Sequence, residues 1–294
     1  MKLEGKAGVV TGTSKGLGRE ILRLATAEGA RVVALARSPQ AADASVGEAI
    51  FVQGDVRREE DVAGAIARCQ AEYGRFDFIV NNAGILGEGR LHETSNELWD
   101  DLVATHLTGT FWGCKHAIAA MRESGRGGAI VNIGSILSFT GDGYLAAYTA
   151  MKSGILGLTK AIAIDYAADG IRCNCVCPGD METPMIEQYF DGTDDAVAAR
   201  AEMEAAYPGK RIAHPREVAT AAIYLLSDDA SFVSGAPLLV DGVAPVEPQL
   251  VGRLDRLDRV GERIVRQHHV AELHRSSFSR SLPSDPRRRG LARH

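Results

Sequence analysis

Short apolar runs alternate with longer amphipathic segments along most of this 294-residue chain. The apolar runs predict strands at 7–11, 31–36, 49–53, 76–81, 129–133, 171–176 and 237–240. The amphipathic segments predict helices at 16–28, 59–73, 96–121, 146–168 and 215–226. Strands without polar alternation are typical of parallel sheets that helices cover on both faces. The pattern therefore predicts an α/β fold with right-handed crossovers, whose ligands bind at the carboxyl ends of the strands.

The composition, with 45% apolar and 24% charged residues, is that of an ordinary globular protein. A net charge of −5 argues against nucleic acid as a partner. We find no secretion signal and no stretch that could span a bilayer, and we expect a cytoplasmic protein without membrane association. The five cysteines should be reduced thiols. We expect no metal site, because the C-x-C-x-C run at 173–177 lacks the second ligand pair of a structural zinc site.

The pattern of the main domain ends near residue 246, and 247–294 has a different composition. This C-terminal extension is rich in arginine and contains no lysine. Apolar residues recur at helical spacing in its first part, and Ser, Pro and Arg dominate its end. We therefore expect residues 1–246 to form the catalytic domain and 247–294 to be partly helical or disordered, either peripheral or in contact with another subunit.

A glycine-rich turn follows the first predicted strand, with Gly12, Gly16 and Gly18 at the opening of the first helix. Glycine allows a sharp turn and a close approach of a pyrophosphate, and the helix N-terminus supplies free N–H groups. A tight connection without a ligand would show the same pattern. Asp55 and the Asn-Asn-Ala-Gly run at 81–84 follow two other strands, so both should lie along the same crevice.

The end of the second predicted strand bears on the choice of cofactor. An acidic residue there would bind the ribose 2′-hydroxyl of NAD, but this chain has Arg37 instead. Lys15 adds a second cation within the glycine-rich turn. Two cations near the adenosine ribose favour a 2′-phosphate, so NADP(H) is favoured over NAD(H). Solvated surface charges are the alternative for both residues.

Tyr148 and Lys152 are four residues apart in a predicted helix and share one of its faces. A nearby ammonium and an oxidised nicotinamide would favour the phenolate, which allows Tyr148 to exchange a proton with an alcohol oxygen. Ser135 follows the preceding strand and is placed to hydrogen-bond the same oxygen. Taken alone, the pair is equally typical of a partly buried tyrosine beside a surface lysine.

In this order the motifs resemble the short-chain dehydrogenase/reductase family over about residues 4–244. The matching segments are Thr11-Gly12-x-x-x-Gly16-x-Gly18, Asn81-Asn82-Ala83-Gly84, Ser135, Tyr148-x-x-x-Lys152, Pro178-Gly179 and Val240-Asp241-Gly242. The resemblance implies a single Rossmann-like, doubly wound domain with a seven-stranded parallel sheet. It also implies a homo-oligomer, a tetramer or dimer, packed through the long helices and the C-terminal strand.

The resemblance further implies that Ser135 positions the substrate carbonyl, Tyr148 is the acid–base residue and Lys152 binds the ribose. Asp55 would contact adenine, Asn81 would line the cofactor with Gly84, and Thr183 would reach the nicotinamide or the phosphates. The residues predicted to bind the cofactor are Gly12, Ser14, Lys15, Gly16, Leu17, Gly18, Arg37, Asp55, Val56, Asn82, Ala83, Gly84, Tyr148, Lys152, Pro178, Gly179, Met181 and Thr183. The spacing of Tyr148 and Lys152 resembles that of carbonyl-reducing members, not of enoyl-reducing ones.

One position departs from the family's pattern. Where the family has an asparagine that completes a water-linked proton relay, this chain has His106. The imidazole can hold the relay water, because it both donates and accepts hydrogen bonds. It can also titrate near neutral pH, or simply be a packed side chain. The predicted catalytic set is therefore Ser135, Tyr148, Lys152 and His106.

We expect the substrate to be a ketone or secondary alcohol, cyclic ones included. It should contact the segment 137–145 and a lid at about 184–213. The lid has no obvious cluster of basic residues, which disfavours a strongly anionic substrate. The predicted substrate residues are Ser135, Leu137, Tyr144, Tyr148, Met185 and Tyr189. Two alternatives are an NAD-linked alcohol dehydrogenase working oxidatively and a weakly catalytic NADP-binding regulator.

Overall fold

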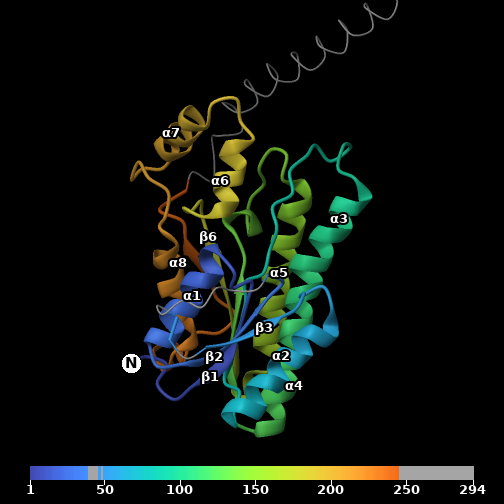
Figure 1. Ribbon diagram of the computed structural model, residues 1–294, viewed down its shortest axis with the longest axis vertical. Helices are drawn as coiled ribbons and strands as arrows, with labels where there is room; N and C mark the ends of the chain where they lie inside the picture. The colour runs from blue at the N-terminus through green and yellow to red at the C-terminus, as the bar shows by residue number, and fades with distance from the viewer. Residues whose placement is uncertain (39–45, 48, 245–294) are drawn as a thin grey trace, which may run out of the picture. The chain divides into compact units, whose positions relative to one another are not determined.

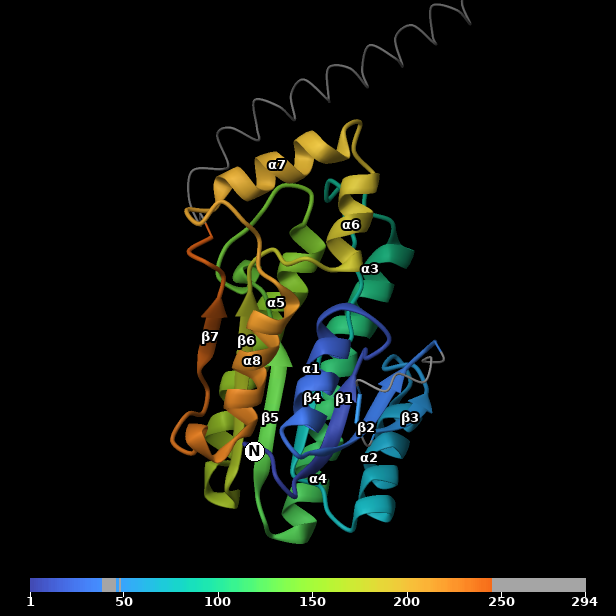
Figure 2. The ribbon, with the colours of Figure 1, turned by 60° about the vertical axis from the view of Figure 1, so that its left-hand side comes forward.

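The computed structural model describes residues 1–38, 46–47 and 49–244. Within them, seven parallel strands form one sheet in the order β3-β2-β1-β4-β5-β6-β7 (Figures 1 and 2). The strands are β1 (Ala7–Thr11), β2 (Arg31–Ala36), β3 (Ala49–Gln53), β4 (Phe78–Asn81), β5 (Gly128–Ile133), β6 (Ile171–Pro178) and β7 (Pro237–Val240). The predicted fold class, with its seven-stranded parallel sheet, is confirmed.

Helices cover both faces of the sheet (Figure 2). On one face lie α1 (Gly16–Ala27) and α8 (Pro215–Leu226), and on the other α2 (Glu59–Tyr73), α4 (Gly109–Ser124) and α5 (Ala146–Asp165). The short helix α3 (Asn96–Leu102) leads into a π-helical turn, η1 (Val103–Thr108), and then into α4. Two helices, α6 (Pro184–Asp191) and α7 (Ala196–Ala206), lie beyond the carboxyl ends of the strands (Figures 1 and 2).

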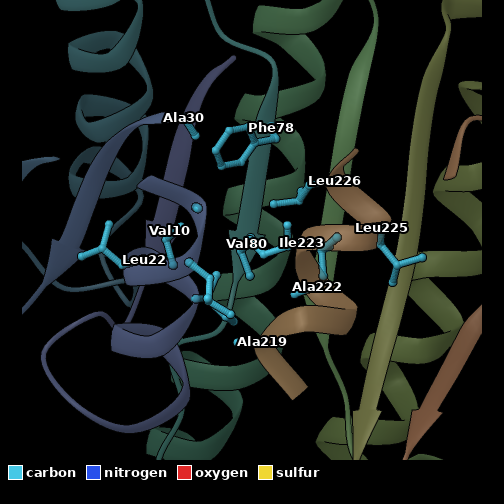
Figure 3. Close-up of a cluster of buried hydrophobic side chains, with 14 of the residues drawn as sticks. Val10, Leu22, Ala30, Phe78, Val80, Ala219, Ala222, Ile223, Leu225 and Leu226 are labelled. Atoms are coloured by element: carbon cyan, nitrogen blue, oxygen red, sulfur yellow. The ribbon is translucent and has the colours of Figure 1, made fainter. Parts of the chain in front are cut away.

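Apolar side chains fill the space between the sheet and each helical layer. On the α1/α8 side, Val10 and Val80 from the central strands meet Leu22 and Ile223, and all four are at most 3% exposed (Figure 3). Burial of each such side chain contributes about 1.5–3 kcal/mol to folding. Because β1 and β4 are neighbours at the centre, the chain reverses its direction of winding there, and their carboxyl ends open the crevice in which such sheets bind ligands.

Two predictions about the elements are wrong in detail, and the lid segment contains helices that were not predicted. The helix predicted at 96–121 is divided into α3, η1 and α4, because six residues adopt the wider π-helical turn. The helix predicted to reach 168 ends at Asp165, and a 3₁₀ turn follows it. The lid segment contains α6, with proline in its first turn, and α7, whose first N–H groups are capped by Asp195. These two start signals are present in the sequence but were not used to predict helices.

The cysteines are free thiols, and all five are buried. Cys173, Cys175 and Cys177 alternate along β6 within the clusters that pack on α5. Among the described residues no three His, Cys, Asp or Glu side chains gather into a possible metal site. No described helix has both the length and the hydropathy that a membrane span requires. The predictions for the C-terminal extension, 247–294, lie outside the described residues.

A buried polar chain joins the central strands to α5 and depends on a glycine in α4. Asn81 Nδ2 donates to Asn132 Oδ1 at 2.8 Å, and Asn132 Nδ2 donates to Thr159 Oγ1 at 2.9 Å. A Cβ at Gly113 would overlap the Asn81 Oδ1 atom. Gly113 therefore provides the space in which the Asn81 amide lies.

We expect Gly113→Ala to lower the free energy of unfolding by about 2–4 kcal/mol, since it overpacks the core and displaces a buried amide. Gly64→Ala is the matched control in α2, where an added Cβ meets open space, and it should raise stability by about 0.5–1 kcal/mol. Urea denaturation measures both values. Equal effects of the two substitutions would contradict the role of Gly113.

Candidate functional site

A cavity of about 350 Å³ lies at the carboxyl ends of the central strands. Apart from Asn81, all residues that the sequence predicted to bind a cofactor line it, together with Ser135 and His106. The sequence did not single out nine further lining residues, which are Leu35, Ala36, Ser38, Gly54, Ile85, Thr105, Ile133, Gly134 and Pro184. Most of these lie beside a predicted residue at a strand end and lack a reactive side chain, so position in the sheet was the only signal for them.

Four predicted residues do not line the cavity. Asn81 is wrong as a cofactor residue, since it is buried in the sheet against Asn132. Leu137 is buried, Tyr189 packs against Phe190 within the lid, and Tyr144 stacks on an arginine. Of the predicted substrate residues, the lining contains Ser135, Tyr148 and Met185.

The glycine-rich turn is shaped for a phosphate group. Gly12 and Gly16 have φ of +71° and +59°, a region that favours glycine. A Cβ at Gly18 would overlap the Gly12 carbonyl oxygen, so the turn can close only without a side chain there. No described side chain caps α1 at Lys15, and its first N–H groups are therefore available to an anion. These residues fit the pyrophosphate of a dinucleotide.

Two cations lie at the outer end of this cavity. Lys15 and Arg37 are exposed lining residues, and neither forms an ion pair with a described residue. The nearby Asp55 is already paired with Arg57 at 2.7 Å. Burial opposes ionisation of Asp55, but the hydrogen bonds from Arg57 outweigh it and hold the pKa of that carboxyl below its ordinary value. The charge of Arg37 contributes to the same lowering of the pKa, but Arg37 forms no ion pair with a described residue, so its guanidinium can bind a ligand.

Hydrogen bonds from α5 to β5 and to the 3₁₀ turn after it, Ile136–Ser138, assemble the reactive side chains. Ser138 Oγ donates to the Lys152 carbonyl at 2.8 Å, and Lys152 Nζ donates to the Ile133 carbonyl at 2.8 Å. Lys152 is only 4% exposed. An ammonium has three N–H donors, so two remain for cofactor hydroxyls. Ser135 Oγ accepts a hydrogen bond from the Leu137 N–H, and its own proton remains available.

Tyr148 lies between Lys152 and His106. The Lys152 Nζ is 5.4 Å from the centre of the phenol ring, and the imidazole meets that ring edge-on at 5.2 Å. Burial and, after it, the charge of Asp180 raise the pKa of Tyr148 above its ordinary value. The expectation that Lys152 lowers this pKa is wrong for the protein's own residues, because loss of solvation disfavours the phenolate more strongly. Burial and the charge of Asp180 keep Tyr148 as a neutral phenol, which can donate a proton.

Lys152 is charged near neutral pH despite its burial, which lowers the pKa of its ammonium to about 8. Among the described residues, no carboxylate accepts a hydrogen bond from the Lys152 ammonium. The charge is instead stabilised by the backbone carbonyl of Ile133. Lys152 can therefore place positive charge beside the phenol without forming an ion pair.

His106 lies in the π-helical turn η1 and is 1% exposed. Its Nε2 lies 2.8 Å from the oxygen and 3.1 Å from the nitrogen of the Ile85 backbone. Burial and the charge of Lys152 lower the pKa of His106 to about 3, so the prediction that it titrates near neutral pH is wrong. Its Nδ1 is buried and has no hydrogen-bond partner among the described residues. Gly84 leaves room for the ring, since a Cβ there would lie 2.7 Å from Cε1.

Comparison with known proteins finds relatives of this chain. A family model described as "Enoyl-(Acyl carrier protein) reductase" matches residues 12–242. 2-(R)-hydroxypropyl-CoM dehydrogenase of Xanthobacter autotrophicus is 39% identical in an alignment of 250 residues that covers 81% of this chain and 97% of that protein. Cis-4-hydroxycyclohexanecarboxylate dehydrogenase of Sinomonas cyclohexanicum is 39% identical over 244 residues, 81% and 95% of the two chains. The crystal structure of levodione reductase superimposes with a TM-score of 0.79 at 32% identity, covering 82% of this chain and 97% of that one.

We expect His106→Asn to keep or raise carbonyl-reducing activity, because an amide can also bond to the Ile85 backbone. The variant should also be less sensitive to acid. As pH falls below 6.5, a histidine in the unfolded chain becomes protonated, whereas His106 in the folded protein stays neutral until about pH 3. At pH 5 this destabilises the wild-type fold by roughly 2 kcal/mol relative to neutral pH, a loss that the variant lacks.

Urea denaturation at pH 7.5 and pH 5 measures this difference. The same loss in both proteins would contradict the assignment of His106 as a buried neutral imidazole. A large fall in reductase rate for the variant would show that the imidazole has a role that asparagine cannot fill.

Proposed function

Since this chain belongs to the short-chain dehydrogenase/reductase family, we propose that it is an NADP(H)-dependent oxidoreductase that interconverts a ketone and a secondary alcohol. One observation carries the proposal. The Tyr148 phenol, the Ser135 hydroxyl and the buried Lys152 ammonium meet in one cavity with the glycine-rich turn. No hydrogen bond occupies the Tyr148 hydroxyl within the described part of the chain, so it is available to a substrate.

In the direction of ketone reduction, the Ser135 and Tyr148 hydroxyls donate hydrogen bonds to the substrate carbonyl oxygen. The residues of the glycine-rich turn and Lys152 would hold NADPH, which when bound would supply the hydride that the carbonyl carbon accepts. Tyr148 then gives its proton to the oxygen, and the nearby Lys152 charge stabilises the phenolate that remains. The two donors act on negative charge as it develops at the oxygen. Oxidation of the alcohol follows the same steps in reverse.

The reacting bond is proposed to be C=O. The matching family model carries the name of an enoyl reductase, which acts on another bond. Tyr148 and Lys152, however, have the four-residue spacing that resembles carbonyl-reducing members. Two of the relatives named above are dehydrogenases of hydroxylated compounds, and this supports the same assignment.

NADP(H) is the proposed cofactor because Lys15 and Arg37 lie exposed along the cavity without an acidic partner among the described residues. Arginine and lysine both bind phosphate, and arginine does so through two parallel N–H groups. A cyclic substrate is supported by the names of two relatives, levodione reductase and cis-4-hydroxycyclohexanecarboxylate dehydrogenase. The apolar lining residues Ile85 and Met185 provide a surface for a hydrocarbon ring.

We expect the wild-type protein to oxidise NADPH faster than NADH when it is offered a panel of cyclic and acyclic ketones. Tyr148→Phe should lower the rate by a factor of 100 or more, because it removes the acid. Arg37→Asp should shift the preference toward NADH, because it replaces the phosphate-binding cation with an acceptor for the ribose hydroxyl. Nicotinamide absorbance at 340 nm measures all three proteins.

The alternatives give other outcomes. A preference for NADH that Arg37→Asp leaves unchanged would identify an NAD-linked alcohol dehydrogenase. Tight NADPH binding without turnover of any ketone would favour a regulator.

We also propose that the chain forms a homo-oligomer through α4 and α5. A shallow apolar hollow on these helices and on η1 is lined by Leu107, Thr108, Phe111, Trp112 and Leu158. Phe111 is 42% exposed there, and Ile164 of α5 is 79% exposed. A second copy of the chain would remove this apolar surface from water.

Sedimentation velocity should give the wild type a mass that is a multiple of 31.4 kDa. Phe111→Glu should lower that mass, because it places a charge within the apolar surface. Leu91→Glu is the control at another exposed apolar residue and should leave the mass unchanged. A monomeric wild type would contradict the proposal.

A further inference from the structure

A second serine lies behind Ser135, outside the cavity. Ser138 ends the short 3₁₀ turn η2 (Ile136–Ser138), which directly follows Ser135. It is 8% exposed and does not belong to the cavity lining, so any effect of Ser138 on a ligand must pass through other residues. Its hydroxyl forms one bond to the backbone of Ser135 and another to α5, the helix that carries Tyr148 and Lys152.

The first of these bonds fixes the backbone of Ser135. The Ser135 N–H donates to Ser138 Oγ at 3.3 Å, and the Ser138 N–H donates to the Ser135 carbonyl at 2.9 Å. The Leu137 N–H donates to Ser135 Oγ at 3.1 Å. The two serines therefore cap the turn reciprocally, an arrangement known as a capping box. Ser135 cannot change its backbone angles or turn its hydroxyl away without breaking these bonds.

The second bond joins the same turn to α5. Ser138 Oγ donates to the Lys152 carbonyl at 2.8 Å. The Lys152 ammonium in turn donates to the carbonyl of Ile133, two residues before Ser135. The bonds thus form a closed ring that passes from the end of β5 through η2 and α5 and back to β5. Within this ring the positions of Ser135 and Lys152 depend on each other.

The ring requires a group that both accepts and donates. In a capping box the residue at the place of Ser138 is usually glutamate or glutamine. An ionised carboxylate could accept from the Ser135 N–H, but it has no proton for the Lys152 carbonyl. A hydroxyl has one proton and two lone pairs, so Ser138 forms both bonds at once. Alanine at this position would form neither.

We propose that Ser138 is a positioning residue, which holds Ser135 against α5 so that the Ser135 and Tyr148 hydroxyls can bind one carbonyl oxygen together. This inference rests on the proposed ketone reductase function. Tyr148 lies one helical turn before Lys152, whose carbonyl accepts the Ser138 bond. Two donors stabilise one developing oxyanion only when both lie within hydrogen-bond distance of it, and a displacement of about 1 Å removes much of the effect.

The first test measures reduction of cyclohexanone by NADPH at pH 7.5 in single turnovers. Ser138→Ala should lower the rate by a factor of about 10 to 100. Its affinity for NADPH, measured by the fluorescence of the bound cofactor, should stay within twofold of the wild type, because Ser138 lies outside the cavity lining. An unchanged rate in Ser138→Ala would overturn the proposal.

Ser227→Ala is the matched control. Ser227 is 1% exposed, and its hydroxyl donates to the Tyr224 carbonyl at 2.8 Å at the end of α8. The control therefore removes a buried hydroxyl that forms the same kind of bond, and urea denaturation compares the loss of stability in the two variants. Ser227→Ala should leave the rate within twofold of the wild type. A fall in rate equal to that of Ser138→Ala would show a general effect of lost stability and overturn the proposal.

A double variant distinguishes positioning from a separate effect on the reaction. Ser135→Ala removes the hydroxyl that Ser138 is proposed to position. The combination of Ser135→Ala with Ser138→Ala should therefore react within threefold of the rate of Ser135→Ala alone. A further fall as large as the one that Ser138→Ala causes in the wild-type background would contradict action through Ser135.

Hydrogen exchange tests the same bonds without turnover. The amides of residues 135–138 should exchange at least tenfold faster in Ser138→Ala than in the wild type, and Ser227→Ala should not change them. Unchanged exchange in Ser138→Ala would overturn the proposal. Absence of turnover of any ketone by the wild type is instead a failure of the proposed function, and the exchange measurement then still decides whether Ser138 holds Ser135. Should Ser138→Ala not fold, Ser138→Cys takes its place, since a thiol forms only weak hydrogen bonds.

Discussion

The hydrogen bond from the buried Lys152 ammonium to the Ile133 carbonyl determines the arrangement of the site around it. A charge removed from water destabilises the fold unless polar groups surround it, and here the end of β5 provides that group. The bond fixes α5 against the sheet, and Tyr148, one helical turn earlier, is thereby placed near Ser135. The same burial that disfavours the charged form of Lys152 keeps the Tyr148 phenol and the His106 imidazole neutral. The burial of α5 against β5 thus determines both where Tyr148 and Lys152 lie and which protonation states Tyr148 and His106 adopt.

The two faces of the sheet differ in what they contribute. The α1/α8 face is almost wholly apolar and supplies packing, while its glycine-rich entry to α1 supplies the phosphate site. The α4/α5 face contains the chain of hydrogen bonds from Asn81 to Thr159, and this chain restricts how the helices can lie on the strands. Directional bonds fix geometry more tightly than apolar contact does. The reactive side chains come from the α4/α5 face, which has both directional hydrogen bonds and apolar contacts.

Much of this could be predicted from the sequence. Apolar runs located the strands, and motifs at strand ends located residues that line the cavity, because parallel strands bring their carboxyl ends to one edge. The π-helical turn was missed because it accompanies a contact between His106 and Ile85, twenty-one residues apart, which helical periodicity does not contain. The raised pKa of Tyr148 was not predicted for a similar reason: the spacing shows Lys152 four residues away, but it does not show the burial of the phenol or the nearby charge of Asp180. Tyr144 lies in an irregular segment and Tyr189 in the short helix α6, and in neither does residue spacing determine the direction of the side chain.

The strand order has a consequence for how the chain reaches this state. β1 is made first but lies at the centre of the sheet, between β2 and β4, and β4 begins only at Phe78. A growing chain therefore holds β1, a strand that is fully buried in the folded protein, with one open edge until about eighty residues have been synthesised. Parallel pairing between distant segments is slow, since loop-closure entropy must be overcome before contacts form. Until β4 arrives, the unpaired edge of β1 is the surface through which nascent chains would associate with one another.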